Sequence, residues 1–155
     1  MEEDRDFNKN ILIAVDESPS ARRAVEYVAR MVGGLPDFKA TILHIIPEPE
    51  EDYFPDPEGK ERWLAGYREK TDRMLGEYRE ILLRGGFSES QVSVKSQLRF
   101  CPSMAECILS EGDDEVYDTI VVGRHGLSRS EEFLFGSISS KIVYHARNLT
   151  VWVVK

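Results

Sequence analysis

The chain has 155 residues, the usual size of one domain, and carries 28 acidic against 20 basic residues, for a formal net charge of −8. This charge argues against a broad electrostatic grip on nucleic acid or on an anionic membrane, since both are bound through clustered Lys and Arg. No apolar run approaches the roughly 20 residues of a membrane span, and the acidic, polar segment 1–10 is unlike a secretory signal, so we expect one cytoplasmic domain over residues 1–155.

The first third of the chain predicts two strands joined by a helix. Residues 11–15 form a continuous apolar run, typical of a strand buried on both faces of a parallel sheet. Ser18 and the proline after it supply a cap and a first-turn residue for a helix that ends at Gly33. Residues 41–46 predict a second buried strand, which Pro47 stops.

The middle third predicts a loop, a long helix, a strand and a short helix. Residues 47–60 are rich in proline and acidic residues and lack periodicity, which indicates a solvated loop. Apolar residues three or four apart predict an amphipathic helix over 61–84, closed by two glycines. Residues 91–99 alternate as a strand, and 102–109 predict a short helix.

The last third completes a strict alternation of strands and helices. Residues 119–122 predict a strand, an apolar face from Ile138 to Ala146 predicts a helix, and 150–154 predict a fifth strand. Right-handed crossovers with short connections favour a doubly wound five-stranded parallel sheet of the α/β class, in the order 3-2-1-4-5. In that order the ends of strands one and four face each other at a switch point, where open α/β sheets bind ligands.

A glycine loop follows the fourth predicted strand at this switch point. Its pattern is G-x2-G-x9-G-S and comprises Gly123, Gly126, Gly136 and Ser137. Glycines let the backbone approach an anion, and the free N–H groups of the next helix's first turn point toward it. The loop therefore predicts a phosphate-binding cradle, although it matches neither the G-x-G-x-x-G fingerprint nor the P-loop.

These motifs, with the Ile-Ala-Val-Asp-Glu-Ser start, the His44-Ile45 strand end and the Val-Val-Lys finish, resemble the universal stress protein family in its ATP-binding branch. The resemblance covers essentially residues 9–155. It implies a Rossmann-like fold of the adenine nucleotide alpha hydrolase type and a homodimeric stress-response or signalling protein that binds ATP. It also implies a divalent ion, Mg²⁺, that arrives with the phosphates and needs no cage made by the protein.

Carried over residue by residue, the resemblance implies a set of nucleotide contacts. Asp16 would approach the ribose or the metal-bound phosphates, Ile45 would meet the adenine, and Gly123 would lie by the ribose. The loop glycines and the start of the last helix would wrap the phosphates. The complete predicted set is Ala14, Asp16, Ile45, Val122, Gly123, Arg124, Gly126, Gly136, Ser137 and Ile138.

Each of these residues also has a purely structural interpretation. Asp16 can belong to the turn that caps the first helix, because Asx side chains commonly accept from local backbone N–H groups. Gly123 and Gly126 can be ordinary turn glycines, and Ser137 can be only the N-cap of the last helix.

The predicted catalytic power is low. The chain lacks a P-loop lysine and an evident base for water, so we expect at most slow ATP hydrolysis and favour a binding and signalling protein over a true enzyme. Glu131 and Glu132 lie in the loop spacer, where a like charge near a triphosphate weakens binding. The alternative is therefore a nucleotide-independent interaction module that recruits partners through its dimer surface or its acidic 47–60 loop. A receiver domain and a flavin carrier share the fold class but fit less well.

Two further expectations concern the ends of strands. The apolar strand Val151–Val154 would form a sheet edge, which favours a homodimer through this strand, the alternative being cover by the N-terminal tail. Cys101 and Cys107 have a spacing typical of neither a redox pair nor a zinc ribbon, so we expect small buried or half-buried hydrophobes. The three histidines are too scattered to predict a metal site.

Overall fold

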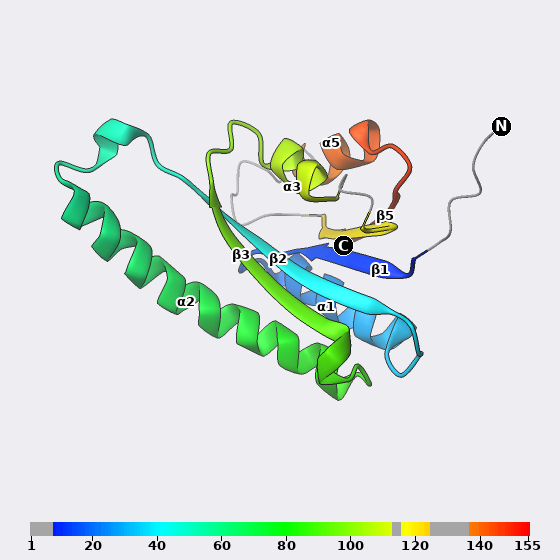
Figure 1. Cartoon of the computed structure of the whole chain (residues 1–155). Helices are drawn as coiled ribbons and strands as arrows, with labels where there is room; N and C mark the ends of the chain where they lie inside the picture. The colour runs from blue at the N-terminus through cyan, green and yellow to red at the C-terminus, as the bar shows by residue number, and fades with distance from the viewer. Residues whose placement is uncertain (1–7, 113–115, 125–136) are drawn as a thin grey trace.

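A computed structural model describes residues 8–112, 116–124 and 137–155, which form one parallel sheet between two layers of helices (Figure 1). The elements in chain order are β1 (Asn10–Ala14), α1 (Pro19–Val32), β2 (Lys39–Pro47), the 3-10 turn η1 (Glu51–Tyr53), α2 (Pro57–Arg84), the 3-10 turn η2 (Glu89–Gln91), β3 (Val92–Arg99), α3 (Met104–Gly112), β4 (Thr119–Gly123), α5 (Ser137–His145) and β5 (Thr150–Val154).

The sheet has five strands in the order β3-β2-β1-β4-β5, and every neighbouring pair is parallel. The predicted fold class and strand order are therefore confirmed. Ala14, the last residue of β1, pairs with Leu43 of β2 on one side and with Val122 of β4 on the other. This register brings the carboxyl ends of the three central strands to one edge of the sheet.

Alternate residues of the central strands feed two separate apolar cores, as the period-2 geometry of a strand requires. Ile11 and Ile13 of β1 pack with α1 and α2 on one face, whereas Leu12 packs with α3 and α5 on the other. Figure 1 shows the two layers, with α3 and α5 above the sheet and α1 and α2 below it. The continuous apolar runs in the sequence reflect this burial on both faces.

Helix α2 begins earlier than predicted. Asp56 caps it by accepting from the Gly59 N–H at 2.6 Å, and Pro57 occupies the first turn, so the helix has 28 residues and its N-terminal part extends beyond the sheet (Figure 1). The prediction of a solvated loop over the whole of 47–60 was wrong in this respect, because a proline after Asp is a helix start as well as a turn signal. Of the helices in the described ranges, none combines the length and apolar character of a membrane span.

The two cysteines are joined in a disulfide, with their Cα atoms 6.1 Å apart. Cys107 is buried and Cys101 half-buried, as expected, but the prediction of two small hydrophobes missed the bond. Helix α3 starts at Met104 and not at Pro102, so a short turn follows β3 and folds Cys101 back against the first turn of α3. Sequence spacing alone does not report this reversal of direction.

Candidate functional site

A cavity of about 330 Å³ lies at the carboxyl ends of β1, β2 and β4. This size falls at the lower end of the range for small-molecule sites, about 300–1,000 Å³. Met104 and Ile108 of α3, Tyr67 of α2 and Ile138 of α5 close it from the helical layers. The walls are mainly apolar, with a few polar groups at the edges; the lining residues are Ala14, Val15, Asp16, Ser18, Ala21, Leu43, His44, Ile45, Pro47, Tyr67, Met104, Ile108, Val122, Gly123, Arg124 and Ile138.

Hydrogen bonds from side chains of the turn itself and of α2 stabilise the turn after β1. One carboxylate oxygen of Asp16 accepts from the Ser18 N–H at 2.8 Å, and Ser18 caps α1 by accepting from the Ala21 N–H at 3.2 Å. The hydroxyl of Tyr78 in α2 donates to the backbone carbonyl of Asp16 at 2.6 Å. Asp16 therefore belongs to the turn that caps α1, as considered from the sequence, and it also lines the cavity.

His44 and Tyr67 form the polar edge of the cavity on the side of β2. Nδ1 of the buried His44 lies 2.7 Å from the Val15 carbonyl oxygen, and because a carbonyl only accepts, Nδ1 carries the proton. Nε2 is then free to accept from the Tyr67 hydroxyl, 3.5 Å away, and the two rings stack with centroids 6.1 Å apart. Burial, followed by the carboxylates of Glu17 and Asp16, raises the pKa of Tyr67, so its hydroxyl stays protonated and able to donate.

Gly123 ends β4 where the strand approaches the first turn of α1. A Cβ atom at this position would lie 2.5 Å from Ser20 Oγ and 2.8 Å from the Ala21 backbone nitrogen. No side chain fits there without moving the backbone of α1. Gly123 is thus more than an ordinary turn glycine, because it allows α1 and β4 to meet beside the cavity.

Arg124 is the one cationic side chain among the described residues that line the cavity. Its backbone is held on both sides, since its N–H donates to the Val154 carbonyl at 2.7 Å and its carbonyl accepts from Ser139 Oγ at 3.4 Å. Helix α5 begins at Ser137, next to Ile138 in the cavity wall. A positive side chain and a helix start therefore lie on the same side of the site.

The structure brings most of the predicted contact residues around this single cavity. Those that line it are Ala14, Asp16, Ile45, Val122, Gly123, Arg124 and Ile138. Ser137 begins α5 one residue before the wall. Gly126 and Gly136, like Glu131 and Glu132, lie outside the described residues. The role of each residue toward a ligand stays a prediction.

Several lining residues were missed by the sequence interpretation. Tyr67 was counted only as an apolar position of the helix over 61–84, and His44 only as part of a strand end. Met104 and Ile108 fell inside the predicted helix over 102–109 and were given no role. Tyr67 carried a usable signal, since a hydroxyl on the apolar stripe of an amphipathic helix needs a buried hydrogen-bond partner. Met104 and Ile108 carried none, because their place depends on how α3 is set over the sheet.

Among the described residues, no group of three or more His, Cys, Asp or Glu side chains is placed to hold a metal ion. Asp16 is the one carboxylate in the described cavity wall. A divalent ion at this site would therefore depend on ligand oxygens for most of its coordination.

Comparisons with known proteins agree with this fold. The family model described as the universal stress protein family matches residues 8–155. A putative universal stress protein of Staphylococcus haemolyticus is 32% identical over 146 residues, covering 89% of this chain and 79% of that protein.

Among solved structures, hypothetical protein MJ0577 superimposes with a TM-score of 0.77 at 25% identity, covering 96% of both chains. A universal stress protein from Archaeoglobus fulgidus, solved in complex with dAMP, has a TM-score of 0.61 at 19% identity and covers 94% of this chain and 97% of its own. The match along nearly the whole sequence, together with the confirmed strand order, places the chain in the universal stress protein family.

Proposed function

We propose that this protein binds an adenine nucleotide, ATP in the first place, in the cavity at the carboxyl ends of β1, β2 and β4. The observation that carries the proposal is the composition of this cavity, in which an apolar slot meets Arg124 and the start of α5. A flat base and a charged phosphate chain need those two environments side by side. The dAMP complex of the Archaeoglobus fulgidus relative supports the ligand class.

The base would occupy the apolar part of the cavity. Val122 of β4 pairs with Ala14 of β1, and Ile45 lies on β2 two residues past Leu43, which pairs with Ala14 on the other side. The small Ala14 side chain leaves the floor open. The Tyr67 hydroxyl and His44 at the rim supply polar groups that can meet a ring nitrogen or an exocyclic amine.

The phosphates would lie toward Arg124 and the first turn of α5 from Ser137. A guanidinium pairs with phosphate oxygens, and the N–H groups at a helix start favour negative charge. Gly126 and Gly136 would extend this cradle. Mg²⁺ would arrive bound to the phosphates, with Asp16 as the nearest carboxylate of the described wall.

We propose that the protein signals through nucleotide binding and not through ATP hydrolysis. The described cavity wall offers one carboxylate and one guanidinium, which can position a nucleotide but provide no evident base for an attacking water. Hydrolysis, if measured, should be slow. A cytoplasmic stress-response role fits this chemistry and the family.

We also propose a homodimer through β5, the edge strand at one end of the sheet. Val153 is 40% exposed there, and Val143 and Tyr144 of α5 are also exposed, at 56% and 84%. Asn8 and Asn10 bond to the segment before β4, at Val116 and Asp118, so the described part of the N-terminal segment leaves β5 uncovered. An uncovered apolar edge favours pairing with a second copy.

A second candidate function is a nucleotide-independent interaction module. The observation in its favour is a row of aromatic rings from η1 to α2, in which Tyr53, Phe54, Trp63 and Tyr67 contact one another in sequence. Tyr53 is 70% exposed and lies in an acidic segment. A partner protein would meet this surface whether or not the cavity is occupied.

Thermal unfolding with a series of nucleotides distinguishes the two candidate functions. Nucleotide-free protein is unfolded thermally with ATP, ADP, AMP or GTP in the presence of Mg²⁺. ATP should raise the unfolding midpoint, because a ligand that binds only the folded state stabilises it. Arg124→Glu should remove most of the difference between ATP and AMP, while Arg84→Glu at the exposed end of α2 should retain it. No shift with any nucleotide would favour the interaction module.

A further inference from the structure

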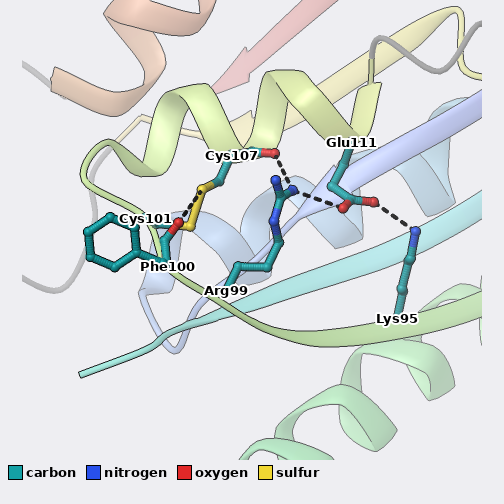
Figure 2. A network of polar contacts seen from close by, with 6 residues as sticks. All are labelled: Lys95, Arg99, Phe100, Cys101, Cys107 and Glu111. Atoms are coloured by element: carbon teal, nitrogen blue, oxygen red, sulfur yellow. Dashed lines mark hydrogen bonds and ion pairs between the residues drawn. A yellow bond between two sulfur atoms is a disulfide. The ribbon is translucent and has the colours of Figure 1, made fainter. Parts of the chain in front are cut away.

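The disulfide between Cys101 and Cys107 is adjacent in the chain to two residues of the cavity wall. It joins the turn after β3 to the first turn of α3, as Figure 2 shows. Met104 lies inside the loop that the disulfide closes, and Ile108 follows Cys107; both residues line the cavity. The bond therefore restrains the part of α3 that would touch a ligand.

The other end of α3 is attached to β3 by charged groups. Glu111 accepts from Lys95 Nζ at 2.7 Å and from Arg99 Nη1 at 3.0 Å, and its side chain is only 11% exposed. Arg99 also donates to the Cys107 carbonyl at 3.4 Å (Figure 2). Breaking the disulfide would thus leave α3 anchored through Glu111 and would release mainly its N-terminal turn.

Both redox forms have local support in the structure. Cys107 Sγ lies 3.8 Å from the Phe100 carbonyl oxygen, a distance at which a thiol can donate a weak S–H···O hydrogen bond. Since the chain has only two cysteines, this pair is its single site of thiol–disulfide chemistry.

We propose that Cys101 and Cys107 form a reversible thiol–disulfide exchange site that reacts with small dithiols and disulfides. The redox state of this pair determines how rigidly Met104 and Ile108 are held in the cavity wall. The thiolate of a dithiol attacks Sγ of the half-buried Cys101 and forms a mixed disulfide, and Cys107 leaves as a thiolate that takes up a proton. The second thiol of the reagent then displaces Cys101. The protein gains two electrons and two protons, and the reagent becomes a disulfide.

Reduction should weaken nucleotide binding, since a loosened α3 turn must be ordered again when the ligand binds. This consequence rests on the proposed nucleotide function, whereas the exchange step does not. The expected effect is a dissociation constant for ATP at least about fivefold higher in the dithiol form.

The exchange step is tested on the folded protein with dithiothreitol, followed by alkylation and mass spectrometry. We expect no alkylation of untreated protein and two alkylated cysteines when dithiothreitol is added first. We expect no alkylation when the reduced protein is freed of dithiothreitol and treated with oxidised glutathione before the alkylating reagent is added. Cysteines that react only after denaturation, or that are already thiols in protein kept without reductant, would overturn the proposal.

The coupling is tested by calorimetric titration of oxidised and reduced protein with ATP and Mg²⁺. The Cys101→Ser/Cys107→Ser variant is the control, because it should bind like reduced protein and ignore the redox treatment. Equal affinity in both forms of the natural protein would overturn the coupling. If neither form binds ATP, the proposed function fails, and the effect of reduction on α3 is then measured by amide hydrogen exchange. Lower protection of residues 103–108 after reduction, with residues 109–112 unchanged, supports the exchange site. Equal protection in the two forms contradicts it.

Discussion

Contacts made by individual residues maintain the shape of the cavity. Tyr78 reaches from α2 to the Asp16 carbonyl and fixes the turn after β1. Gly123 lets β4 and α1 touch. Both residues support the site without having to contact a ligand. Substitutions at the two positions therefore test how the cavity is built.

Tyr78→Phe should lower the free energy of unfolding by about 1–2 kcal/mol near pH 8, because a buried hydrogen bond is lost and the Asp16 carbonyl loses its donor. Urea unfolding measures the change. Tyr53→Phe, on a side chain that is 70% exposed, is the control and should stay within about 0.5 kcal/mol of the natural protein. A loss no larger than in this control would contradict the role given to Tyr78.

The stability advantage of the natural protein over the Tyr78→Phe variant should also depend on pH. Burial first, and then the Asp16 carboxylate, raises the pKa of Tyr78 from 10.0 to about 12. The unfolded chain therefore loses this proton at lower pH than the folded protein. The advantage is complete below pH 10 and decreases as the pH rises from 10 toward 12. Urea unfolding of both proteins at pH 8 and pH 11 checks this, and an equal difference at the two values would contradict it.

Gly123→Ala should destabilise the protein by about 1–3 kcal/mol, since the added methyl group meets the backbone of Ser20 at 2.7 Å and overpacks the contact. Gly76→Ala is the matched control on α2, where a Cβ atom meets nothing within 4 Å. That substitution should raise stability by about 0.5–1 kcal/mol through helix propensity. Thermal unfolding of the two variants should move in opposite directions; equal shifts would contradict the close approach.

At the scale of the element, α3 is joined to β3 by two different kinds of bond. The disulfide holds its first turn, and the carboxylate of Glu111 holds its last turn through Lys95 and Arg99 (Figure 2). The low exposure of Glu111 makes the ion pairs stronger than surface pairs, because water screens them less.

Glu111→Gln should cost about 1–3 kcal/mol of stability, since it leaves Lys95 and Arg99 without their shared carboxylate. Glu80→Gln removes an exposed pair with Arg84 on α2, where the side chains are 53% and 80% exposed, and should cost less than about 0.5 kcal/mol. Chemical denaturation of both variants checks the contrast. Similar losses would mean that the β3–α3 pairs contribute no more than surface charges.

At the scale of the whole molecule, the sheet has two exposed edges with different surroundings. Strand β3 closes one edge and β5 the other. Val94 of β3 and Val153 of β5 are almost equally exposed, at 42% and 40%. The proposed dimer uses only the β5 edge, so this pair of valines offers a matched test.

Val153→Lys should raise the dissociation constant of the dimer at least about tenfold, a change of about 1.4 kcal/mol, because an edge lysine opposes strand pairing. Val94→Lys should leave it unchanged. Sedimentation velocity over a concentration series measures both. A natural protein that stays monomeric throughout, or equal effects of the two substitutions, would contradict a dimer through β5.

The sequence predicted the sheet well, for reasons that particular residues make clear. The continuous apolar runs at 11–15 and 119–122 belong to strands that are buried on both faces of the sheet. Runs of this kind can be recognised as buried strands from the sequence. The alternation of elements indicated a doubly wound parallel sheet, and the order proposed for it, one of the common orders of such sheets, is the one observed. The start of α2 was misplaced because Asp56 and Pro57 are also favoured in loops.

The cavity was predicted only in part. Asp16, Gly123 and Arg124 lie at or just after the carboxyl ends of β1 and β4, so the strand order brings them together. Tyr67 and Met104 reach the cavity from helices, and their positions depend on how α2 and α3 lie against the sheet. The disulfide depends on a chain reversal of the same kind. Tertiary packing of this sort is not encoded in a local pattern.

Nucleotide binding in this cavity is tested by calorimetric titration of nucleotide-free protein with ATP and Mg²⁺, in parallel with the Ala14→Leu variant, whose larger side chain fills the floor of the cavity. We expect saturable binding by the natural protein with a dissociation constant below about 1 mM, and at least about tenfold weaker binding by the folded variant. A folded natural protein that binds no ATP, or a variant that binds equally well, would contradict this proposal.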